Sequence, residues 1–355
     1  MSNLTKLTNK FSNHDWQSDV SLAKYTFMRV GGPAEVFWIA NSLDELVKVV
    51  SFCFEQQIPV TIFGGASNVI VMDEGIAGLV VLNQCSNFQI FESEKELSQF
   101  DLPDNFSILT STEVTIARLK KIEDDNHQFN WQQPHWVLAE SGLITARLST
   151  ATANQGLSGL EPFVGVPGAL GGAIYNNSHY QSELIGDFIV AVEVLDKQGN
   201  RNWLPQKECD FAYDYSRFQQ TGEIILRALL VIFPADKDLI KQKIQASSLH
   251  RAQTQPLGFA SSGCIFKNVS LSPEESKRFD GQTKLSAGWL IDQAGLKGYR
   301  QGGAMVSDVH ANFIINTDRA SSHDVEKLVS HIQKTVKQKF NLDLEPEVFF
   351  IGKEK

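Results

Sequence analysis

Short apolar runs alternate with one amphipathic stretch near the start of the chain. Residues 36–40, 59–63 and 78–82 each form a compact apolar run typical of a buried strand. Residues 42–56 have helical spacing, and Glu45 completes a capping-box pattern at their beginning. This strand–helix–strand order predicts a small α/β unit with a right-handed crossover.

The middle of the chain has a weaker pattern. Residues 83–138 mix charged stretches with strand-like pieces such as 111–116, and they predict sheet with long loops. Residues 188–195 carry an apolar side chain at every second place, which predicts a half-buried strand. Further elements expected here are strands at 136–139 and 223–233 and a helix at 143–155.

Helical spacing dominates the last third of the chain. Residues 236–251 predict a helix that connects two domains, with apolar Leu239, Ile240, Ile244 and Leu249. Residues 323–340 predict a long helix with an apolar stripe formed by Val325, Leu328, Val329, Ile332 and Val336. Shorter elements are a helix at 287–293 and strands at 312–316 and 346–352. The expected class is α+β or mixed α/β, in two or three units.

Composition and charge limit the possible functions. The 355 residues are 42% hydrophobic, which excludes wholesale disorder, and the chain is too long for one compact core. A formal charge of −9 makes sequence-independent nucleic-acid binding improbable. Backbone N–H groups can still bind phosphate without lysine.

The four cysteines, Cys53, Cys85, Cys209 and Cys264, are widely spaced, and no CxxC or HExxH pattern occurs. We therefore expect no metal site and a reducing compartment. The polar start and the lack of a long apolar run predict no signal peptide and no membrane span. The expected location is cytoplasmic.

Clustered glycines are the strongest chemical signal. Residues 64–68, Gly-Gly-Ala-Ser-Asn, follow a strand and could form a backbone nest for a pyrophosphate or simply a tight turn. Residues 161–177 offer a stiff, bare backbone for a flat ring system and its phosphates; the alternative is a loop built for small-residue packing. The dinucleotide fingerprint and the P-loop are both absent.

Weaker candidates lie elsewhere. Cys264 stands in a glycine-led turn and, taken alone, is most simply a buried structural thiol. His310, Asn312 and the Glu-Pro-Glu of 345–347 are most simply residues at strand ends. A serine-hydrolase elbow is excluded because the spacing after Ser158 fails.

Nine segments occur together in one order: 26–32, 64–68, 156–161, 166–172, 263–268, 287–292, 295–298, 302–304 with 310–313, and 344–348. In that order the chain resembles the UDP-N-acetylenolpyruvoylglucosamine reductase family. Residues 83–138 carry no part of the resemblance.

The resemblance implies a fold and an activity. The fold is a vanillyl-alcohol-oxidase-type FAD-binding region of two subdomains plus a C-terminal α+β substrate domain. The expected divisions are 1–82 and 83–236 for FAD, 237–342 for the UDP-sugar, and a returning strand at 343–355. NADPH would reduce FAD, which would reduce the enolpyruvyl group of the UDP-sugar to UDP-N-acetylmuramate, in a monomeric enzyme. Another FAD-linked oxidase of this fold and a catalytically degenerate binding protein are the alternatives.

The resemblance and the glycine pattern together name site residues. Those expected to bind the cofactor are Arg29, Gly64, Gly65, Ala66, Ser67, Asn68, Gly142, Gly165, Pro167, Gly168, Gly171, Gly172, Ala173 and Asn176. Those expected to bind substrate are Tyr213, Lys267, Asn268 and His310. Cys264 stands where the family has a proton-donating serine, and Glu347 matches a catalytic glutamate.

One departure from the family is serious. The family's Tyr-Arg-x-Ser motif, whose arginine stabilises the enolate, is replaced by a motif with Asp214 at the arginine position. We expect Arg217 to supply the guanidinium, oriented by Asp214, although an odd offset on a strand would turn it to the other face. His179, in a stretch that also departs from the family, is a further candidate near the flavin.

Overall fold

The computed structural model describes residues 3–97, 108–122 and 129–352. The chain divides into two compact units. Unit 1 comprises residues 1–16, 37–65 and 78–249, and unit 2 comprises residues 17–36, 66–77 and 250–355. The expected domain boundaries stay a prediction; in these units the short segment 66–77 groups with the C-terminal hundred residues.

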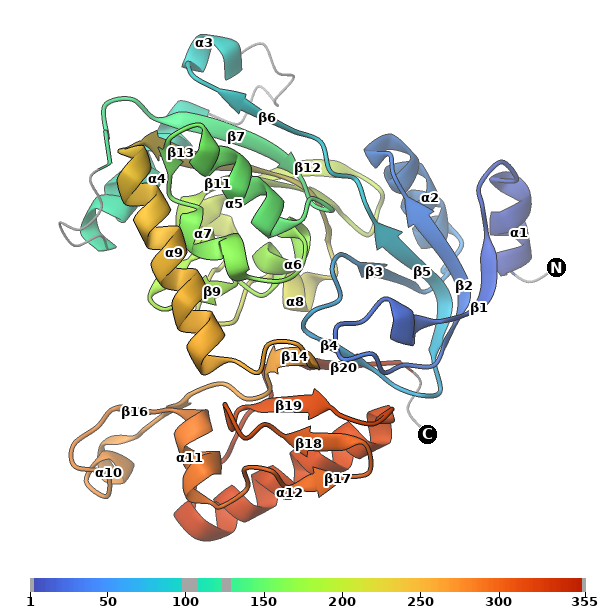
Figure 1. The fold of residues 1–355 in the computed structure, drawn as a ribbon. Coiled ribbons are helices and arrows are strands. Elements are labelled where there is room, and N and C mark those ends of the chain that lie inside the picture. Colours follow the sequence, from blue (N-terminus) through green and yellow to red (C-terminus); the bar gives the residue numbers. More distant parts are fainter. Residues whose placement is uncertain (1–2, 98–107, 123–128, 353–355) are drawn as a thin grey trace. The chain divides into compact units, whose positions relative to one another are not determined.

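The elements follow one another along the sequence (Figure 1). Those of unit 1 are α1 (Asn3–Lys10), α2 (Leu43–Glu55), β3 (Val60–Phe63), β6 (Phe88–Phe91), α3 (Glu94–Leu97), α4 (Ile108–Ile122), β7 (His135–Glu140), α5 (Thr145–Asn154), β8 (Leu157–Ser158), α6 (Leu170–Tyr175), β9 (His179–Tyr180), β10 (Glu183–Leu184), α7 (Ile185–Phe188), β11 (Ile189–Leu195), β12 (Arg201–Pro205), α8 (Phe218–Thr221) and β13 (Ile224–Pro234). Those of unit 2 are β1 (Gln17–Ser21), β4 (Val69–Val71), β14 (Ala260–Cys264), β15 (Val269–Ser270), α10 (Pro273–Ser276), β16 (Lys284–Leu285), α11 (Ala287–Gln293), β17 (Arg300–Gln301), β18 (Ala304–Val306), β19 (Phe313–Asn316), α12 (Ser322–Phe340) and β20 (Phe349–Ile351). Strands β2 (Pro33–Ala40) and β5 (Ile76–Asn83) and helix α9 (Lys237–Thr254) contribute residues to both.

The predicted α/β start of the chain is confirmed. A four-stranded sheet has the order β1-β2-β5-β3, with β3 and β5 parallel. Ser42 caps α2 by accepting the N–H of Glu45, as the sequence predicts. The Glu45 carboxylate instead contacts His14 and Lys48.

The core of unit 1 is a six-stranded sheet with the path β12-β11-β13-β7-β6, and β8 also pairs with β13. The prediction that β11 is half-buried is wrong, since all seven of its residues are buried. The strand lies inside the sheet with β12 and β13 paired to its two edges, and α4 packs against it.

The expected strand at 111–116 is also wrong, because these residues lie in the middle of α4. Thr112 and Thr115 suit a strand by propensity, but both are buried on the inner side of this helix. Trp136 Nε1 donates to the Thr112 hydroxyl, and the Thr115 hydroxyl donates to the carbonyl of Ile189. Tertiary packing therefore overrides local propensity here. The charged stretch at 123–128 lies outside the described residues.

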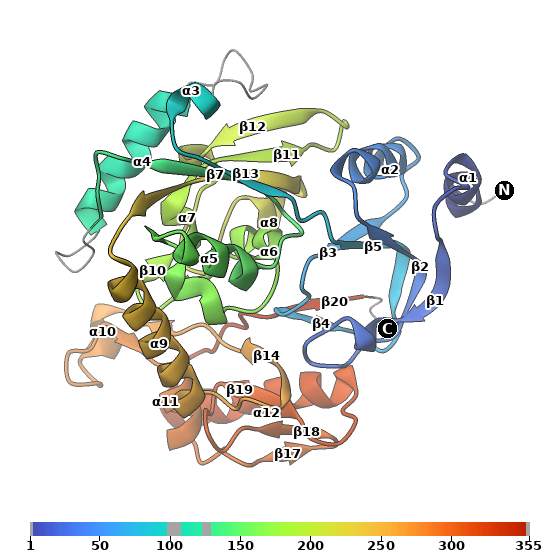
Figure 2. The ribbon, with the colours of Figure 1, turned by 45° about the horizontal axis from the view of Figure 1, so that its top comes forward.

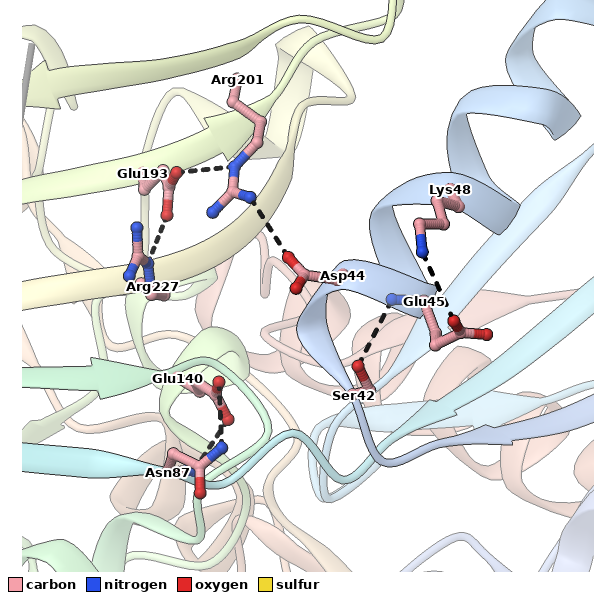
Figure 3. Close-up of polar contacts among 9 residues, drawn as sticks. All are labelled: Ser42, Asp44, Glu45, Lys48, Asn87, Glu140, Glu193, Arg201 and Arg227. Carbon is pink, nitrogen blue, oxygen red and sulfur yellow. Dashed lines mark hydrogen bonds and ion pairs between the residues drawn. The ribbon is translucent and has the colours of Figure 1, made fainter. Parts of the chain in front are cut away.

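Glu193 on β11 holds the sheet of unit 1 through two arginines (Figure 3). Its carboxylate is buried and accepts from Arg201 on β12 and from Arg227 on β13. Arg201 also faces Asp44 of α2, with Nη1 and Oδ1 3.6 Å apart. Cross-strand charge pairing thus joins three neighbouring strands.

Replacing Glu193 with alanine is expected to lower the free energy of unfolding by about 3–5 kcal/mol, because it leaves guanidinium groups without their buried partner. Urea denaturation followed by circular dichroism measures the change. Asp44→Ala is the matched control: its carboxylate is exposed, so the loss there is expected to be no more than about 1 kcal/mol. Equal effects of the two variants would contradict this account.

Unit 2 is built around α12 and the sheet β14-β19-β18-β17, along which this helix lies in both views (Figures 1 and 2). The predicted stripe is confirmed: Val325, Leu328, Val329, Ile332 and Val336 are all buried. Strand β20 pairs in parallel with β4, Phe349 lying opposite Val69.

Helix α9 forms where the sequence predicts it, but its apolar pattern is not a core stripe. Of its residues only Ile240 is buried, and Leu249 is 59% exposed. Among the described residues, no helix is both long and apolar enough to cross a membrane.

Candidate active site

The two glycine-rich segments predicted as phosphate nests pack against each other in unit 1. A Cβ on Gly65 would lie 2.4 Å from the Cα of Gly168, and one on Gly64 would lie 2.9 Å from the Cβ of Ala169. Contacts this short leave no room for a side chain at Gly65 unless the backbone shifts. The turn after β3 and the approach to α6 are thus packed directly on each other and form one bare backbone surface, that is, one built of residues with no side chain or a small one.

Gly142 and Gly171 extend the same surface. The N–H of Gly171 donates to the carbonyl of Ser141 at 2.7 Å, and the N–H of Leu170 donates to Leu143 at 2.8 Å. A Cβ on Gly142 would lie 2.6 Å from the carbonyl oxygen of Cys85. The structure therefore brings together Gly64, Gly65, Gly142, Gly168 and Gly171, which are more than a hundred residues apart in sequence at the extremes.

Two features of α6 leave room for a ligand. Outside α6 itself, the described residues place no atom within 4 Å of a Cβ on Gly172, so this glycine is not needed for packing against them. Asn176, directly after α6, is 8% exposed, and its Oδ1 receives no hydrogen bond from the described residues. Leaving a buried acceptor unpaired costs free energy, so a bound group with a donor fits this position.

Sequence reasoning missed the role of Glu161, which fixes the loop before Gly165 and Pro167. Its carboxylate is fully buried and accepts from the Ser158 hydroxyl and the Gly159 N–H, each at 2.6 Å. Lys243 on α9 lies 3.5 Å from the same carboxylate. The only available signal was an acidic residue at the end of a Gly-Leu-Ser-Gly-Leu run.

In unit 2, residues 66–68 are held by two other segments of the resemblance. Phe27 N–H donates to the carbonyl of Ala66, and Asn68 Nδ2 donates to the carbonyl of Glu347 at 3.2 Å. Arg29 and Ala66 both adopt left-handed backbone conformations, with φ of 56° and 46°. The Arg29 side chain is exposed. The chain thus brings Phe27 and Glu347, from sequence-distant segments, to residues 66–68.

The segments that contain Cys264 and Glu347 are joined by backbone hydrogen bonds. The N–H of Glu347 donates to the carbonyl of Ile265 at 2.8 Å, and the N–H of Lys267 donates to the carbonyl of Glu345 at 2.9 Å. Lys267 Nζ also lies 2.7 Å from a carboxylate oxygen of Glu345. The segments 263–268 and 344–348 therefore form one ribbon that carries both predicted catalytic residues.

The remaining predicted substrate residues of unit 2 have framework contacts of their own. Asn312 holds Phe266 through both its amide nitrogen and its amide oxygen, and its N–H donates to Nδ1 of His310. Burial lowers the pKa of His310. Asn268 Oδ1 accepts the N–H of Ala287 at the start of α11. These contacts fix where the side chains lie.

Cys264 differs from the other three cysteines in its exposure. Cys53, Cys85 and Cys209 are buried, and burial raises the pKa of each thiol to about 12. Cys264, at the end of β14, is partly exposed and forms no disulfide.

Iodoacetamide at about pH 8 is therefore expected to alkylate Cys264 in the folded protein and to spare the other three, because the thiolate is the reactive form. Peptide mass spectrometry after quenching measures each site. Unfolding in urea is the control and should make all four react. Labelling of Cys53, Cys85 or Cys209 in the folded protein at the rate of Cys264 would contradict the assignment.

The predicted pairing of Arg217 with Asp214 is wrong. Arg217 lies against Glu223, with Nε and Oε2 3.2 Å apart, and donates Nη1 to the carbonyl of Glu208. Asp214 instead faces His179, with Oδ1 and Nδ1 3.1 Å apart. The offset of three residues places Arg217 at the start of α8, outside the turn that holds Asp214.

Solved structures define the class to which this architecture belongs. A vanillyl-alcohol-oxidase-type flavoprotein from Myceliophthora thermophila C1 matches with a TM-score of 0.50 at 8% identity, covering 95% of this chain and 84% of that one. That likeness concerns the fold alone, which is the fold of this class of FAD-binding proteins. A crystal structure of UDP-N-acetylenolpyruvylglucosamine reductase from Thermus caldophilus matches with a TM-score of 0.67 at 28% identity, covering 94% and 98%.

Sequence comparison narrows the class to a family. The C-terminal domain of UDP-N-acetylenolpyruvoylglucosamine reductase matches residues 255–351. The reductase of Bacillus subtilis (strain 168) is 32% identical over 93% of this chain and 92% of its own length. That of Listeria welshimeri serovar 6b is 32% identical over 100% of both. The chain belongs to the UDP-N-acetylenolpyruvoylglucosamine reductase family, and it is an FAD-type oxidoreductase of peptidoglycan precursor synthesis.

Proposed function

We propose that this protein uses NADPH to reduce the enolpyruvyl group of UDP-N-acetylglucosamine enolpyruvate to the lactyl ether of UDP-N-acetylmuramate. The observation that carries the proposal is the ribbon of 263–268 and 344–348, in which backbone hydrogen bonds hold the segment of Cys264 beside the segment of Glu347. Family membership over the full chain supports the substrate class.

The bare backbone surface of unit 1 would hold the cofactor. Gly64 and Gly65 pack on residues 168 and 169, and the backbone N–H groups of this region could bind a pyrophosphate, since such groups bind anions without a cationic side chain. The open side of Gly172 and the unpaired Oδ1 of Asn176 fit the same bound group. When bound, FAD accepts hydride from reduced nicotinamide and passes it to the substrate double bond.

Residues of unit 2 would supply the proton and bind charge. The Cys264 thiol would donate a proton to the carbon next to the substrate carboxylate and regain one from water. Hydride and proton together reduce the double bond, while the nicotinamide is oxidised. Glu347, on the facing segment, would complete the proton-transfer site.

Lys267 is suited to a substrate phosphate. Its present partner, Glu345, is 72% exposed, and such exposed pairs are weak. A phosphate can displace that carboxylate and form a stronger charge-assisted hydrogen bond. Tyr213, Asn268 and His310 remain proposed substrate contacts.

An anaerobic flavin spectrum tests the function. NADPH should bleach the purified yellow protein, and adding the enolpyruvyl UDP-sugar should restore the colour with formation of UDP-N-acetylmuramate. Recolouring by oxygen alone would indicate an oxidase, and no recolouring by the UDP-sugar would indicate a degenerate protein. Parallel runs with NADH measure the preference for the nicotinamide.

A further inference from the structure

Asp214 is a buried carboxylate that the framework does not satisfy. Its side chain is 0% exposed, and neither carboxylate oxygen receives a hydrogen bond from the described residues. The backbone has φ of 52°, within a tight turn closed by the Ala212 and Tyr215 backbones. Burying a charge without donors is costly, so the group that faces this carboxylate is of special interest.

That group is the imidazole of His179. Its Nδ1 lies 3.1 Å from Asp214 Oδ1, and its side chain remains 24% exposed. Because Nδ1 faces the carboxylate, Nε2 is the nitrogen left for other partners. The ring of Tyr213, which is 37% exposed, lies 4.8 Å from the imidazole ring centre to centre. The oriented imidazole of His179 and the phenol of Tyr213 thus lie next to each other, and both are accessible to solvent.

His179 and the turn of Asp214 are both connected by hydrogen bonds to α6, whose residues we assign to the cofactor. Gln219 Nε2 donates to the carbonyls of both Tyr175 and Asp214, and the Ser216 hydroxyl donates to Tyr175 at 2.6 Å. On the other side, the Ser178 N–H donates to the carbonyl of Ala173. Helices α6 and α8 lie side by side in both views (Figures 1 and 2). The Asp214 turn and His179 are therefore both anchored to the same short helix.

We propose that His179 is an anion-binding residue of the active site and that Asp214 is its positioning residue. In its imidazolium form His179 offers a charged N–H from Nε2, while Asp214 compensates the ring charge from behind. The anion is a carboxylate or phosphate: the carboxylate of the enolpyruvyl substrate or a phosphate of the nicotinamide. The inference rests on the proposed function. Arg217 is already bound by Glu223 and the carbonyl of Glu208, whereas His179 faces Asp214 directly.

The first test measures the two flavin half-reactions in His179→Gln. Glutamine keeps a hydrogen-bonding group but removes the charge, so the concentration of the affected ligand at half-maximal rate should rise on the order of 10- to 100-fold. A rise confined to the enolpyruvyl UDP-sugar identifies its carboxylate as the anion, and a rise confined to NADPH identifies a nicotinamide phosphate. His179→Lys, which restores a cation, should recover part of the affinity, whereas a merely structural histidine would not be rescued. His135→Gln, a histidine at the start of β7, is the control and should behave as the wild type.

The second test separates positioning from binding. Asp214→Asn should raise the same half-saturation concentration with a smaller effect on the maximal rate, and adding it to His179→Gln should have little further effect. Unchanged half-reactions in His179→Gln, or full additivity of the two changes, would overturn the proposal. If Asp214→Asn fails to fold, the glutamine and lysine variants of His179 decide alone. If the wild type is active and His179→Gln has the same kinetics, only this inference is overturned. If the wild type itself does not turn over the substrates, the proposed function is overturned as well.

Discussion

Cys264→Ala is expected to lower kcat by about 10²- to 10⁴-fold, the range for loss of a positioned proton donor. Cys264→Ser should stay within about tenfold of the wild type, since a hydroxyl can occupy the same place and donate a proton. The location of Cys264 supports its role as proton donor, because the thiol is partly exposed at the end of β14 and belongs to the ribbon that also carries Glu347. The other three cysteines are buried and are not expected to affect chemistry.

The decisive measurement separates the half-reactions in Cys264→Ala. Reduction of the flavin by NADPH should keep its wild-type rate, while reoxidation by the enolpyruvyl UDP-sugar should slow by the full factor. Ser261→Ala, on the same strand, is the matched control and should change neither rate. If Cys264→Ala reoxidises at the wild-type rate, Cys264 is not the proton donor.

Most elements could be predicted because their pattern is local. The stripe of α12 and the cap of α2 depend on residues within a few turns of one another, and both form as expected. The helix at 111–116 could not be predicted, because its threonines find partners in Trp136 and Ile189, which belong to sequence-distant strands. The full burial of β11 likewise depends on sequence-distant neighbours, the strands β12 and β13 at its edges and the helix α4 packed against it, which alternation along one strand does not reveal.

The candidate site could likewise be predicted only in part from the sequence. Glycine clustering identified both backbone segments, but it could not show that Gly65 and Gly168 touch. The sequence marks Asp214 as a departure from the family's Tyr-Arg-x-Ser motif, yet spacing along the chain does not reveal its partner. His179 lies thirty-five residues before Asp214 and meets it because both are anchored to α6. Pairing of charges in a buried site depends on the fold and not on sequence spacing.

Two glycine substitutions should separate packing from cofactor binding. Gly65→Ala forces a methyl group to within 2.4 Å of Gly168 Cα, so the backbone must shift; the expected loss of apoprotein stability is about 1–3 kcal/mol, with a loss of FAD binding. Gly172→Ala meets nothing within 4 Å, and alanine in a helix is favoured over glycine by roughly 0.5–1 kcal/mol. Its apoprotein should therefore be at least as stable as the wild type.

The second expected effect of Gly172→Ala is on FAD binding. If α6 presents Gly172 to the bound FAD, the added methyl group occupies space that the ligand needs, and the dissociation constant should rise roughly tenfold or more, equivalent to about 1.4 kcal/mol. Urea unfolding of the two apoproteins and quenching of flavin fluorescence on titration measure the two quantities independently. A Gly172→Ala protein that binds FAD as tightly as the wild type would place the cofactor elsewhere on unit 1. Weakened binding with undiminished stability has no explanation in packing, since the described residues outside α6 place no atom within 4 Å of that methyl group, and it would assign the open side of α6 to the flavin.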